Sequence, residues 1–380
     1  MTWQEVTIGT LANVVGGGTP STRIPEYWAG DIPWFTPAEI PETGAGVVTR
    51  SKRSITREGL AKSAAKLLPA GTVLVTSRAS IGNCAIAGVP VTTNQGFASL
   101  IPKDFRSTRY LYYCVQQNRG KLLSRAAGST FLEISAPKVR EIELLAPSAG
   151  EQERIGVALS DADDLIATLE RLIAKKQAIK QGMIQQLLTG RTRLPGFASP
   201  WSELSLVNVA RIKTGSRNNQ DKQAGGKYPF FVRSATVERI DSYSYDCEAI
   251  LVPGEGGIGS IFHYINGKFE VHQRVYKISD FAPNASGRFI YYFMRQYFGV
   301  HAMENSVKAT VDSLRLPTFK NFQLRLPSRN EQDAIVCILD DAEAEVATLK
   351  LRLTKARAIK TGMMQQLLTG RTRLPVEAAS

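Results

Sequence analysis

The sequence contains the same unit twice. Residues 182–195 read GMIQQLLTGRTRLP and residues 362–375 read GMMQQLLTGRTRLP. The match extends upstream at a constant offset of 180 residues, and from Glu151 and Glu331 onward 26 of 45 aligned positions are identical. A repeat at a fixed period indicates a duplicated structural unit. The chain therefore consists of two copies, each a variable region followed by a near-constant tail.

The two copies divide the chain into four domains. They are a first head (residues 1–148), a first tail (149–195), a second head (196–328) and a second tail (329–380). The heads keep only short echoes of each other, such as Ile32-Pro-Trp-Phe beside Tyr228-Pro-Phe-Phe. Sequence that stays alike in the tails and diverges in the heads indicates a shared role for the tails and a separate role for each head.

Positive charge is concentrated in the heads. The formal net charge of the chain is +13, to which the heads contribute +6 and +5 and the tails +1 each. A basic excess confined to one region indicates where a polyanion such as the DNA backbone would bind. A surface charge that only keeps the protein in solution is the alternative explanation.

Composition places the chain among globular proteins of a reducing compartment. Hydrophobic residues make up 43% of the 380 residues, and the N-terminus lacks the pattern of a signal peptide. No apolar run reaches the roughly 20 residues of a membrane-spanning helix. The four cysteines are isolated and only three histidines occur, which argues against a disulfide framework and against a bound metal. We therefore expect a cytoplasmic protein.

Both tails are predicted to be long helices. Apolar residues in each follow the alternating spacing of four and three that forms a coiled-coil seam. In the first tail they are Ile155, Leu159, Ala162, Ile166, Leu169 and Ile173, and in the second they are Ile335, Leu339, Ala342, Val346, Leu349 and Leu353. Because Gly and Pro are nearly absent before Gly182 and Gly362, helices are predicted over about 150–181 and 330–361. Each would be about 48 Å long.

The order of charges predicts how these helices pair. Each helix begins with acidic residues and ends with basic ones, from Glu151 to Lys180 and from Glu331 to Lys360. Antiparallel packing brings acids against bases, whereas complementing the helix dipole is an alternative reason for the same order. We expect an antiparallel pair that relates the two heads by a pseudo-two-fold axis and brings the chain termini close together.

The heads are predicted to be mixed α/β domains, so that the fold class of the chain is α+β. Short apolar runs separated by Gly, Pro and Asn predict strands over 72–76, 249–252, 260–265 and 271–278. Short helices are predicted over 108–117 and 288–298.

Motifs in the heads and tails resemble those of one protein family. The first head opens with Gly16-Gly-Gly-Thr-Pro-Ser-Thr and Glu26-Tyr-Trp-Ala-Gly-Asp-Ile-Pro-Trp-Phe-Thr, and the tails begin with Glu-Gln and end with Gln-Gln-Leu-Leu-Thr-Gly-Arg. These stretches and their order resemble the specificity (S) subunit of type I restriction-modification systems over essentially the whole chain. The second head departs from the pattern, because Thr214-Gly-Ser-Arg217 stands where the Gly-Gly-Gly-Thr stretch would fall.

The resemblance implies that the heads are two target recognition domains, separated by two long antiparallel coiled-coil helices. Such a subunit has no catalytic site or cofactor of its own. It binds double-stranded DNA, recognises a bipartite target, and directs the adenine methylation and cleavage carried out by two modification (methyltransferase) subunits and by restriction subunits. Those partners would hold S-adenosylmethionine, ATP and Mg²⁺. The helices would act as a ruler that keeps the half-sites about one turn of DNA apart, ~34 Å.

Candidate DNA contacts are polar or basic residues of predicted loops whose side chains suit bases or phosphates. In the first head they are Arg23, Arg50, Lys52, Arg53, Ser77, Arg78, Asn94 and Gln95. In the second head they are Lys213, Arg217, Asn218, Asn219, Gln220, Arg233, His272, Gln273, Arg274 and Lys308. A solvated surface side chain is the alternative for each of them. Packing is favoured over base stacking for four aromatic residues, Trp28, Trp34, Tyr243 and Tyr245.

One motif suggests a different function. Gly254-Glu-Gly-Gly-Ile-Gly259 matches the G-x-G-x-x-G of dinucleotide sites, but that fingerprint needs a helix directly after it and a strand is predicted there. A loop between strands is therefore favoured. Neither an ATP-binding P-loop sequence nor the Asn/Asp-Pro-Pro-aromatic sequence of amino-methyltransferases occurs. Two alternatives stay open: a methyltransferase or nuclease with its own active site, and a non-catalytic scaffold that binds protein.

Overall fold

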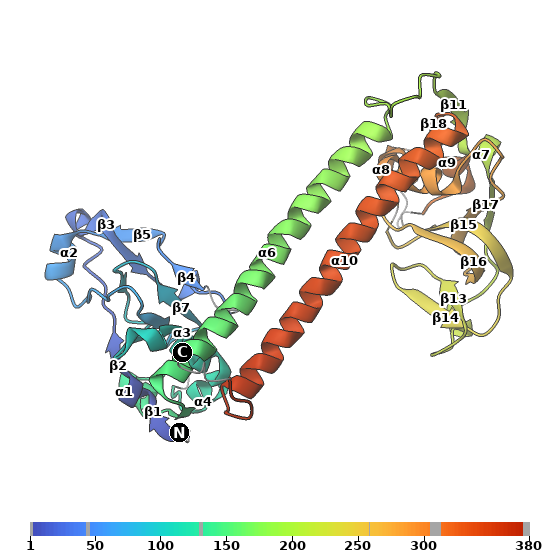
Figure 1. Cartoon of the computed structure of the whole chain (residues 1–380). Helices are drawn as coiled ribbons and strands as arrows, with labels where there is room; N and C mark the ends of the chain where they lie inside the picture. Colours follow the sequence, from blue (N-terminus) through green and yellow to red (C-terminus); the bar gives the residue numbers. More distant parts are fainter. Residues whose placement is uncertain (1–2, 43–45, 129–131, 258, 305–312, 375–380) are drawn as a thin grey trace. The chain divides into compact units, whose positions relative to one another are not determined.

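The chain folds into two compact units, each built from one head and parts of both tails. The structure, a computed structural model, describes residues 3–42, 46–128, 132–257, 259–304 and 313–374. The first unit contains residues 1–170 and 351–380, and the second contains residues 171–350. The two long helices are α6 (Ala149–Leu187) and α10 (Arg329–Leu367), each of 39 residues (Figure 1). Among the described helices, none has the length and apolar character that crossing a membrane requires.

The first head is a mixed α/β domain. Its strands are β1 (Gln4–Thr7), β2 (Ala12–Gly16), β3 (Trp28–Phe35), β4 (Val47–Val48), β5 (Arg53–Ile55), β6 (Val73–Val75), β7 (Cys84–Ala87), β8 (Thr92–Thr93), β9 (Ala98–Pro102) and β10 (Glu143–Ala146). Its helices are α1 (Ile8–Leu11), α2 (Arg57–Ala61), α3 (Thr108–Gln117), α4 (Arg119–Ser124) and α5 (Ala136–Arg140), with 3₁₀ turns at Pro25–Tyr27, Pro37–Glu39 and Phe105–Ser107. The strands form three sheets in the orders β2-β9-β6-β7-β4, β5-β3-β8 and β1-β10.

Helix α3 covers the main sheet of the first head. It packs on β6 and β7, and it buries the side chains of Tyr110, Leu111 and Val115 in the core of the unit. Ile155 of α6 and Leu367 of α10 belong to the same core. The helix predicted over 108–117 is confirmed by α3, and the strand predicted over 72–76 is confirmed by β6.

The second head repeats this architecture. Its strands are β11 (Ser202–Ser205), β12 (Arg211–Thr214), β13 (Tyr228–Phe231), β14 (Val237–Ile240), β15 (Tyr245–Pro253), β16 (His263–Val271), β17 (Val275–Ser279) and β18 (Gln323–Leu326). Its helices are α7 (Leu206–Val209), α8 (Gly287–Glu304) and α9 (Leu316–Lys320), with a 3₁₀ turn at Asn219–Asp221. The strands form a sheet in the order β12-β17-β15-β16-β13-β14 and the pair β11-β18.

The large sheet of the second head is strongly curled. Strand β16 pairs Phe269 with Tyr245 at the start of β15, while β17 pairs Val275 with Pro253 at its end. In a flat sheet Phe269 and Val275 would be at least ~26 Å apart. The six Cα–Cα steps from Phe269 to Val275 reach only ~20 Å when fully extended. Strand β15 must therefore bend so that its two ends approach each other.

Two strand predictions in the second head need correction. The strand predicted over 271–278 is interrupted at His272–Arg274, because the chain turns there and His272 Nδ1 accepts a hydrogen bond from the Arg274 N–H at 2.9 Å. The strand predicted over 260–265 begins only at His263. The predictions over 249–252 and 288–298 are confirmed, because these residues lie inside β15 and α8.

The two heads share one plan although their sequences have diverged. In the first head Phe35 pairs in parallel with Thr93, and in the second Phe231 pairs in parallel with Val271. The next residue then makes the same hydrogen bond in each: the Asn94 N–H donates to the Phe35 carbonyl and the His272 N–H to the Phe231 carbonyl, both at 3.0 Å. The echo between Ile32-Pro-Trp-Phe and Tyr228-Pro-Phe-Phe is therefore confirmed.

The long helices extend further than the sequence predicts. Both were expected to end near Gly182 and Gly362, yet α6 continues to Leu187 and α10 to Leu367. A Gly inside a helix weakens it by only about 1 kcal/mol relative to Ala, which the packing of neighbouring turns overcomes. The chain leaves each helix just before Gly190 and Gly370, whose φ angles are +69° and +72°. Only Gly adopts this left-handed conformation at low cost.

In each unit the two tails pack antiparallel. In the first unit Asp163 of α6 lies 2.6 Å from Lys360 of α10, and Glu170 lies 2.6 Å from Arg357. From the first ion pair to the second, the residue number rises on α6 and falls on α10, so the two helices run antiparallel. Lys176–Glu345 at 2.7 Å and Lys180–Glu343 at 3.3 Å show the same order in the second unit. Exposed ion pairs of this kind specify orientation more than they stabilise.

A tyrosine of each head is bonded to the paired helices. The Tyr113 hydroxyl donates to Asp163 at 2.7 Å, and Asp163 is the partner of Lys360. In the second unit the Tyr292 hydroxyl lies 2.8 Å from Glu343, the partner of Lys180. Both triads join one head helix to the beginning of one tail and to the end of the other. We name them the Tyr-acid-Lys triads.

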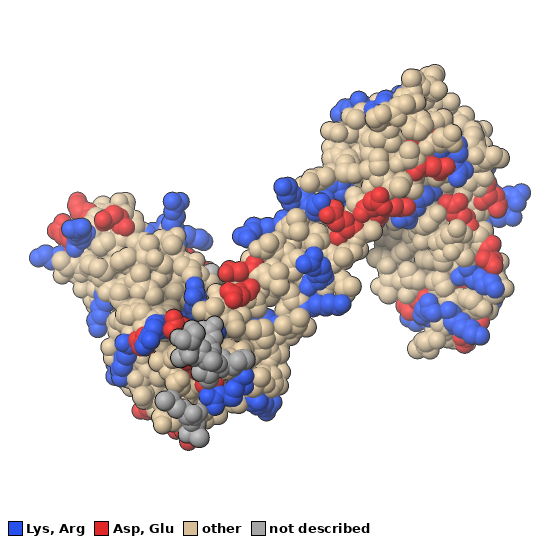
Figure 2. Space-filling view, viewed as in Figure 1, with Lys and Arg blue, Asp and Glu red and all other residues tan. Residues whose placement is uncertain are grey.

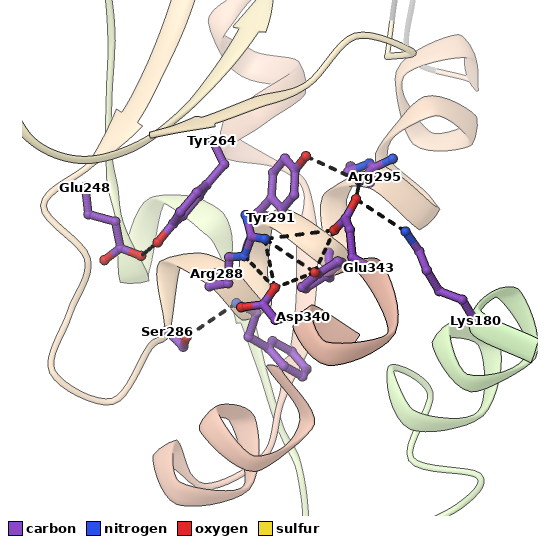
Figure 3. Close-up of polar contacts among 11 residues, drawn as sticks. Lys180, Glu248, Tyr264, Ser286, Arg288, Tyr291, Arg295, Asp340 and Glu343 are labelled. Carbon is purple, nitrogen blue, oxygen red and sulfur yellow. Dashed lines mark hydrogen bonds and ion pairs between the residues drawn. The ribbon is translucent and has the colours of Figure 1, made fainter. Parts of the chain in front are cut away.

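The triad of the second unit is part of a larger network (Figure 3). Arg288 donates to Asp340 Oδ1 through Nε at 2.9 Å and through a terminal nitrogen at 2.8 Å, and the Tyr292 hydroxyl lies 2.5 Å from the same oxygen. Arg295 lies 3.6 Å from Glu343. Burial raises the pKa of Tyr292, and so do its contacts with Asp340 and Glu343. The hydroxyl is thus held as a neutral donor between two carboxylates.

An ion pair with a buried glutamate joins the two tails within each unit. Arg193 binds Glu331 through two nitrogens at 2.6 and 2.8 Å, and Arg373 binds Glu151 through two nitrogens at 2.5 and 2.6 Å. The glutamate side chains are only 1% and 3% exposed. Each pair joins the end of one tail to the beginning of the other tail. Beside the second pair the Trp3 ring packs against Gly370, so the described ends of the chain lie close together, as predicted.

Candidate nucleic-acid interface

Four loops of the second head meet around the turn between β16 and β17. They follow β12, β13 and β15, and the fourth is the turn His272–Arg274 itself. The Gln273 N–H donates to the Arg217 carbonyl at 2.9 Å, and the Gln273 side-chain amide donates to Asn218 Oδ1 at 2.6 Å. A groove of about 380 Å³ beside them is lined in part by Arg217, Gln220 and Ser242. The structure therefore brings together candidate residues that are up to 57 positions apart, from Arg217 to Arg274.

Acidic side chains hold the arginines of this cluster in place. Glu255 lies 3.2 Å from Arg233 through one carboxylate oxygen and contacts Arg274 through the other. Glu270 has no exposed surface, lies 3.4 Å from Arg217 and accepts a hydrogen bond from Ser244 at 2.6 Å. Burial and the neighbouring arginines lower the pKa of His272. The imidazole is therefore neutral near pH 7, and its Nδ1 serves as the acceptor of the turn.

The first head has an equivalent loop cluster. The Thr19 hydroxyl donates to Gln95 Oε1 at 2.6 Å, and in the second head the equivalent Gln273 bonds to the corresponding loop, at Arg217 and Asn218. The Ser77 N–H donates to the Gly96 carbonyl at 2.8 Å, and Arg78 lies 2.8 Å from Glu133. Thr19, Arg78 and Gln95 thus lie on three loops that converge on one surface of the head.

An aromatic platform adjoins the first-head cluster. The Arg53 guanidinium lies 3.6 Å from the centre of the Trp28 ring, and the Trp28 and Trp34 rings pack edge to face at 5.0 Å. The Trp34 Nε1–H donates to the Gly18 carbonyl at 2.9 Å. Trp34 is buried, so packing is its role, as predicted, while Trp28 remains partly accessible beneath Arg53.

The Gly-rich motif of the second head is a loop at this surface. The Gly254 N–H donates to the Arg274 carbonyl at 2.8 Å, as the Ser77 N–H does to Gly96, and the loop leads into strand β16 without a helix of the dinucleotide type. Residues 77–82 and the described residues 254–257 and 259 are therefore in equivalent loops. Glu255, which sequence reasoning did not select, occupies the position of Arg78. Aligning the shared Ile-Gly ends of the two loops would have found it.

The turn before each cluster requires a glycine. A Cβ atom on Gly17 would overlap the carbonyl oxygens of Thr93 and Asn94, and one on Gly215 would overlap those of Val271 and His272. The stretch Thr214 to Arg217 therefore takes the place of Gly16 to Thr19, although only one glycine is common to both. Close backbone approach is the physical requirement at this shared position. Gly18 meets a separate one, because a Cβ atom there would overlap the carbonyl carbon of Ala64.

Several candidates lie outside these clusters. Lys213 lies on the edge strand β12, and Arg23, Arg50 and Lys52 lie on exposed loops without a described contact to the clusters. Lys308 falls outside the described residues. Ser77 and His272 are buried, with 3% and 4% exposure, so their backbone or ring positions the loops instead of presenting a free side chain.

The other two histidines have structural partners. His263 Nε2 lies 3.1 Å from the Ser234 carbonyl, and His301 Nε2 lies 3.0 Å from the Thr318 carbonyl. His301 lies inside α8, because this helix continues to Glu304, beyond the predicted end at residue 298. Within the part of the chain that the structure describes, no three His, Cys, Asp or Glu side chains are grouped so that they could hold a metal ion.

The basic residues do not form one continuous patch on the visible face. Figure 2 shows Lys and Arg side chains in small groups over each unit, with Asp and Glu side chains between them. The net positive charge of the heads is thus a balance of interspersed charges, and it is the loop clusters that give individual cations a defined geometry.

Comparison with known proteins identifies the family. The family model described as the type I restriction modification DNA specificity domain matches residues 1–181 and again residues 198–356. The chain belongs to this family. The two matches follow the internal repeat, so each head with its tail is one specificity domain.

Individual relatives support this assignment. The chain is 43% identical over 166 residues to the type I restriction enzyme MjaIX specificity subunit of Methanocaldococcus jannaschii, which covers 43% of this chain and 38% of that protein. It is 31% identical over 183 residues to the EcoR124I/EcoR124II specificity subunit of Escherichia coli, covering 46% of this chain and 44% of that protein. The matched segment therefore spans less than half the length of these relatives.

Solved structures share the fold of the specificity domains. The S subunit of the type I restriction-modification system from M. genitalium superimposes with a TM-score of 0.67 over 96% of both chains, at 16% sequence identity. The HsdS subunit from Thermoanaerobacter tengcongensis gives a TM-score of 0.53 over 97% of both chains, at 17% identity. At this identity the likeness concerns the fold alone.

Proposed function

We propose that the chain is the sequence-specific DNA-binding subunit of a type I restriction-modification complex and has no catalytic site of its own. One observation carries the proposal: each head holds a loop cluster at the same place in its fold, and these clusters contain arginine, asparagine or glutamine side chains of the kind that suits base edges. Each head would bind one half of a bipartite target. The net positive charge of both heads supports binding to the phosphate backbone.

The chemistry of the clusters suits base edges in the major groove. Arginine pairs with two acceptors of guanine, and the amide of asparagine or glutamine pairs with adenine. Gln95 and Gln273 occupy equivalent positions, whereas Arg78 stands where the second head has Glu255. Because the glutamine is shared but Arg78 and Glu255 carry opposite charges, the two heads would recognise different half-site sequences.

The repeated tails suit two copies of one partner. Ile179 of α6 and Ile359 of α10 are equivalent in the repeat, and their side chains are exposed. Two similar surfaces would bind two modification subunits, to which restriction subunits are added. In this proposal S-adenosylmethionine, ATP and Mg²⁺ bind to those partners, and the complex works in the cytoplasm.

Mapping of methylated adenines in cells that express the chain with its modification partner tests the proposal. We expect one motif made of two sequence blocks with unread base pairs between them. Replacing residues 1–148 by the head of another specificity subunit should change one block and leave the other. A change in both blocks, or the absence of any common motif, would contradict the proposal.

Salt dependence separates this function from a protein-binding scaffold. Because binding to phosphates releases counterions, the logarithm of the DNA affinity should fall linearly with the logarithm of the salt concentration. An affinity for DNA that does not change between about 50 and 200 mM salt would favour the scaffold.

A further inference from the structure

Glu255 is an acidic side chain in the middle of the basic loop cluster of the second head. It lies directly after β15, between Arg233, which follows β13, and Arg274, which lies in the turn before β17. One carboxylate oxygen of Glu255 is 3.2 Å from Arg233 and the other contacts Arg274. The glutamate side chain is 20% exposed, whereas the two arginine side chains are about half exposed.

A carboxylate at this position weakens the attraction to DNA. Its negative charge repels phosphates and offsets one of the cations beside it. The residue therefore does not serve affinity in general. Its contribution must come from the geometry that it gives to Arg233 and Arg274, which are brought together from loops 41 residues apart in the sequence.

The arrangement orders two flexible side chains before DNA arrives. A free arginine loses rotamer freedom when it binds, and that loss reduces the affinity for the correct sequence. Planar guanidinium groups that are already held by a carboxylate lose less, and they present their remaining N–H groups in a fixed direction. The loop backbone is fixed as well, because the Leu314 N–H donates to the Gly254 carbonyl at 2.8 Å.

We propose that Glu255 is a positioning residue that holds Arg233 and Arg274 for sequence discrimination in the second half-site, at the expense of general affinity for DNA. This inference rests on the proposed function. The first head lacks the device, because the equivalent loop position is occupied by Arg78, whose ion-pair partner is Glu133 at 2.8 Å. The half-site read by the first head is therefore an internal control.

Selection from a pool of random DNA duplexes tests the inference. The probe is the purified complex of the chain with its modification subunits. Wild-type complex should enrich two sequence blocks. In E255Q the block read by the second head should lose its sequence preference by about tenfold. The block read by the first head should keep its preference. The retained fraction of unselected duplex should rise, and the slope of log affinity against log salt should steepen by up to about 0.9.

Two variants separate geometry from charge. E255D keeps the negative charge, but its side chain is one methylene shorter and cannot reach both arginines. The complex should therefore lose its preference for the block read by the second head. It should not retain more unselected DNA, because the charge is unchanged. E203Q removes an acid of the same head that pairs with Arg325 at 3.6 Å in the β11–β18 pair. This control should keep both blocks.

The outcomes distinguish the inference from the function on which it rests. If E255D keeps the preference for the second block, Glu255 acts only through its charge. If E255Q weakens the preference for both blocks equally, Glu255 acts only through general stability. Either result refutes the positioning role. If the wild-type complex enriches no block at all, the proposed function itself fails. The unfolding temperature of each variant, measured beside wild type, identifies a loss that is due to unfolding.

Discussion

The Tyr-acid-Lys triads make a quantitative prediction about the stability of each unit. Tyr292→Phe removes the hydroxyl that lies between Asp340 and Glu343 and leaves the buried ring in place. Tyr113→Phe makes the equivalent change in the first unit, where the hydroxyl donates to Asp163. Each variant should destabilise only the unit that contains it, because each triad lies entirely within one unit.

The size of the effect follows from the exposure of the partners. A hydrogen bond to a charged group contributes about 1.5–3 kcal/mol when it is buried. The carboxylate side chains of Asp163 and Glu343 are 37% and 36% exposed, and solvent screens such contacts. We therefore expect each variant to lower the stability of its unit by the low end of this range, about 1.5 kcal/mol. This corresponds to roughly a tenfold increase in the equilibrium constant for opening of that unit.

Hydrogen exchange of backbone amides is the assay, because it reports the stability of each unit separately. In Tyr292→Phe the protected amides of α8 should exchange about tenfold faster while those of α3 stay unchanged, and Tyr113→Phe should give the reverse. Tyr297→Phe, on α8 and packed against Phe293 at 4.8 Å, is the control and should change neither. Equal acceleration in both helices from either variant would refute the assignment of each triad to its own unit.

Three further predictions concern other features. Burial raises the pKa of Cys84 and of Cys114 to about 12, whereas the unfolded thiols ionise near 9.0. Between these values the unfolded chain loses the thiol protons first, which stabilises the unfolded state. The unfolding free energy measured by urea titration should therefore fall as pH rises from about 9 toward 12. In the native chain at pH 8, Ellman's reagent should modify the exposed Cys337 and leave Cys84 and Cys114 unmodified; rapid modification of either buried thiol would contradict the described core. Gly215→Ala forces a Cβ atom onto the carbonyls of the neighbouring turn and should lower the unfolding free energy by about 1–3 kcal/mol, so an unchanged denaturation midpoint would show that the turn can relax.

The long helices and their pairing could be predicted because their signals are local and periodic. A heptad seam fixes which face is buried, and opposite charges at the two ends of each tail fix the direction, as the pair Lys360–Asp163 confirms. The helix ends could not be predicted as well. Gly182 is tolerated inside α6 because the packing of neighbouring turns overcomes its cost, while Gly190 ends the helix region with its positive φ, and the sequence does not distinguish the two.

The loop clusters could be predicted only in part. Arg217 and Gln273 were selected for their residue type, but their contact depends on a curled sheet that sequence patterns do not reveal. Residue type does not predict Glu255, because an acid repels phosphates, and it predicts Lys213 as a loop contact although Lys213 lies on the edge strand β12. Residue chemistry identifies candidates, whereas long-range pairing of strands decides which of them meet.

The way the repeat copies interlock sets an order for folding during synthesis. The second unit is one continuous stretch, residues 171–350, and can complete its core as soon as that stretch has left the ribosome. The first unit needs Leu367, Leu368 and Arg373 from the last part of the chain, although its head is made first. At a synthesis rate of about 5–20 residues per second, these residues are made on the order of 10–40 s after the first head. The N-terminal domain is thus the last to mature, and its unfinished core is the part of a nascent chain that chaperones would have to protect.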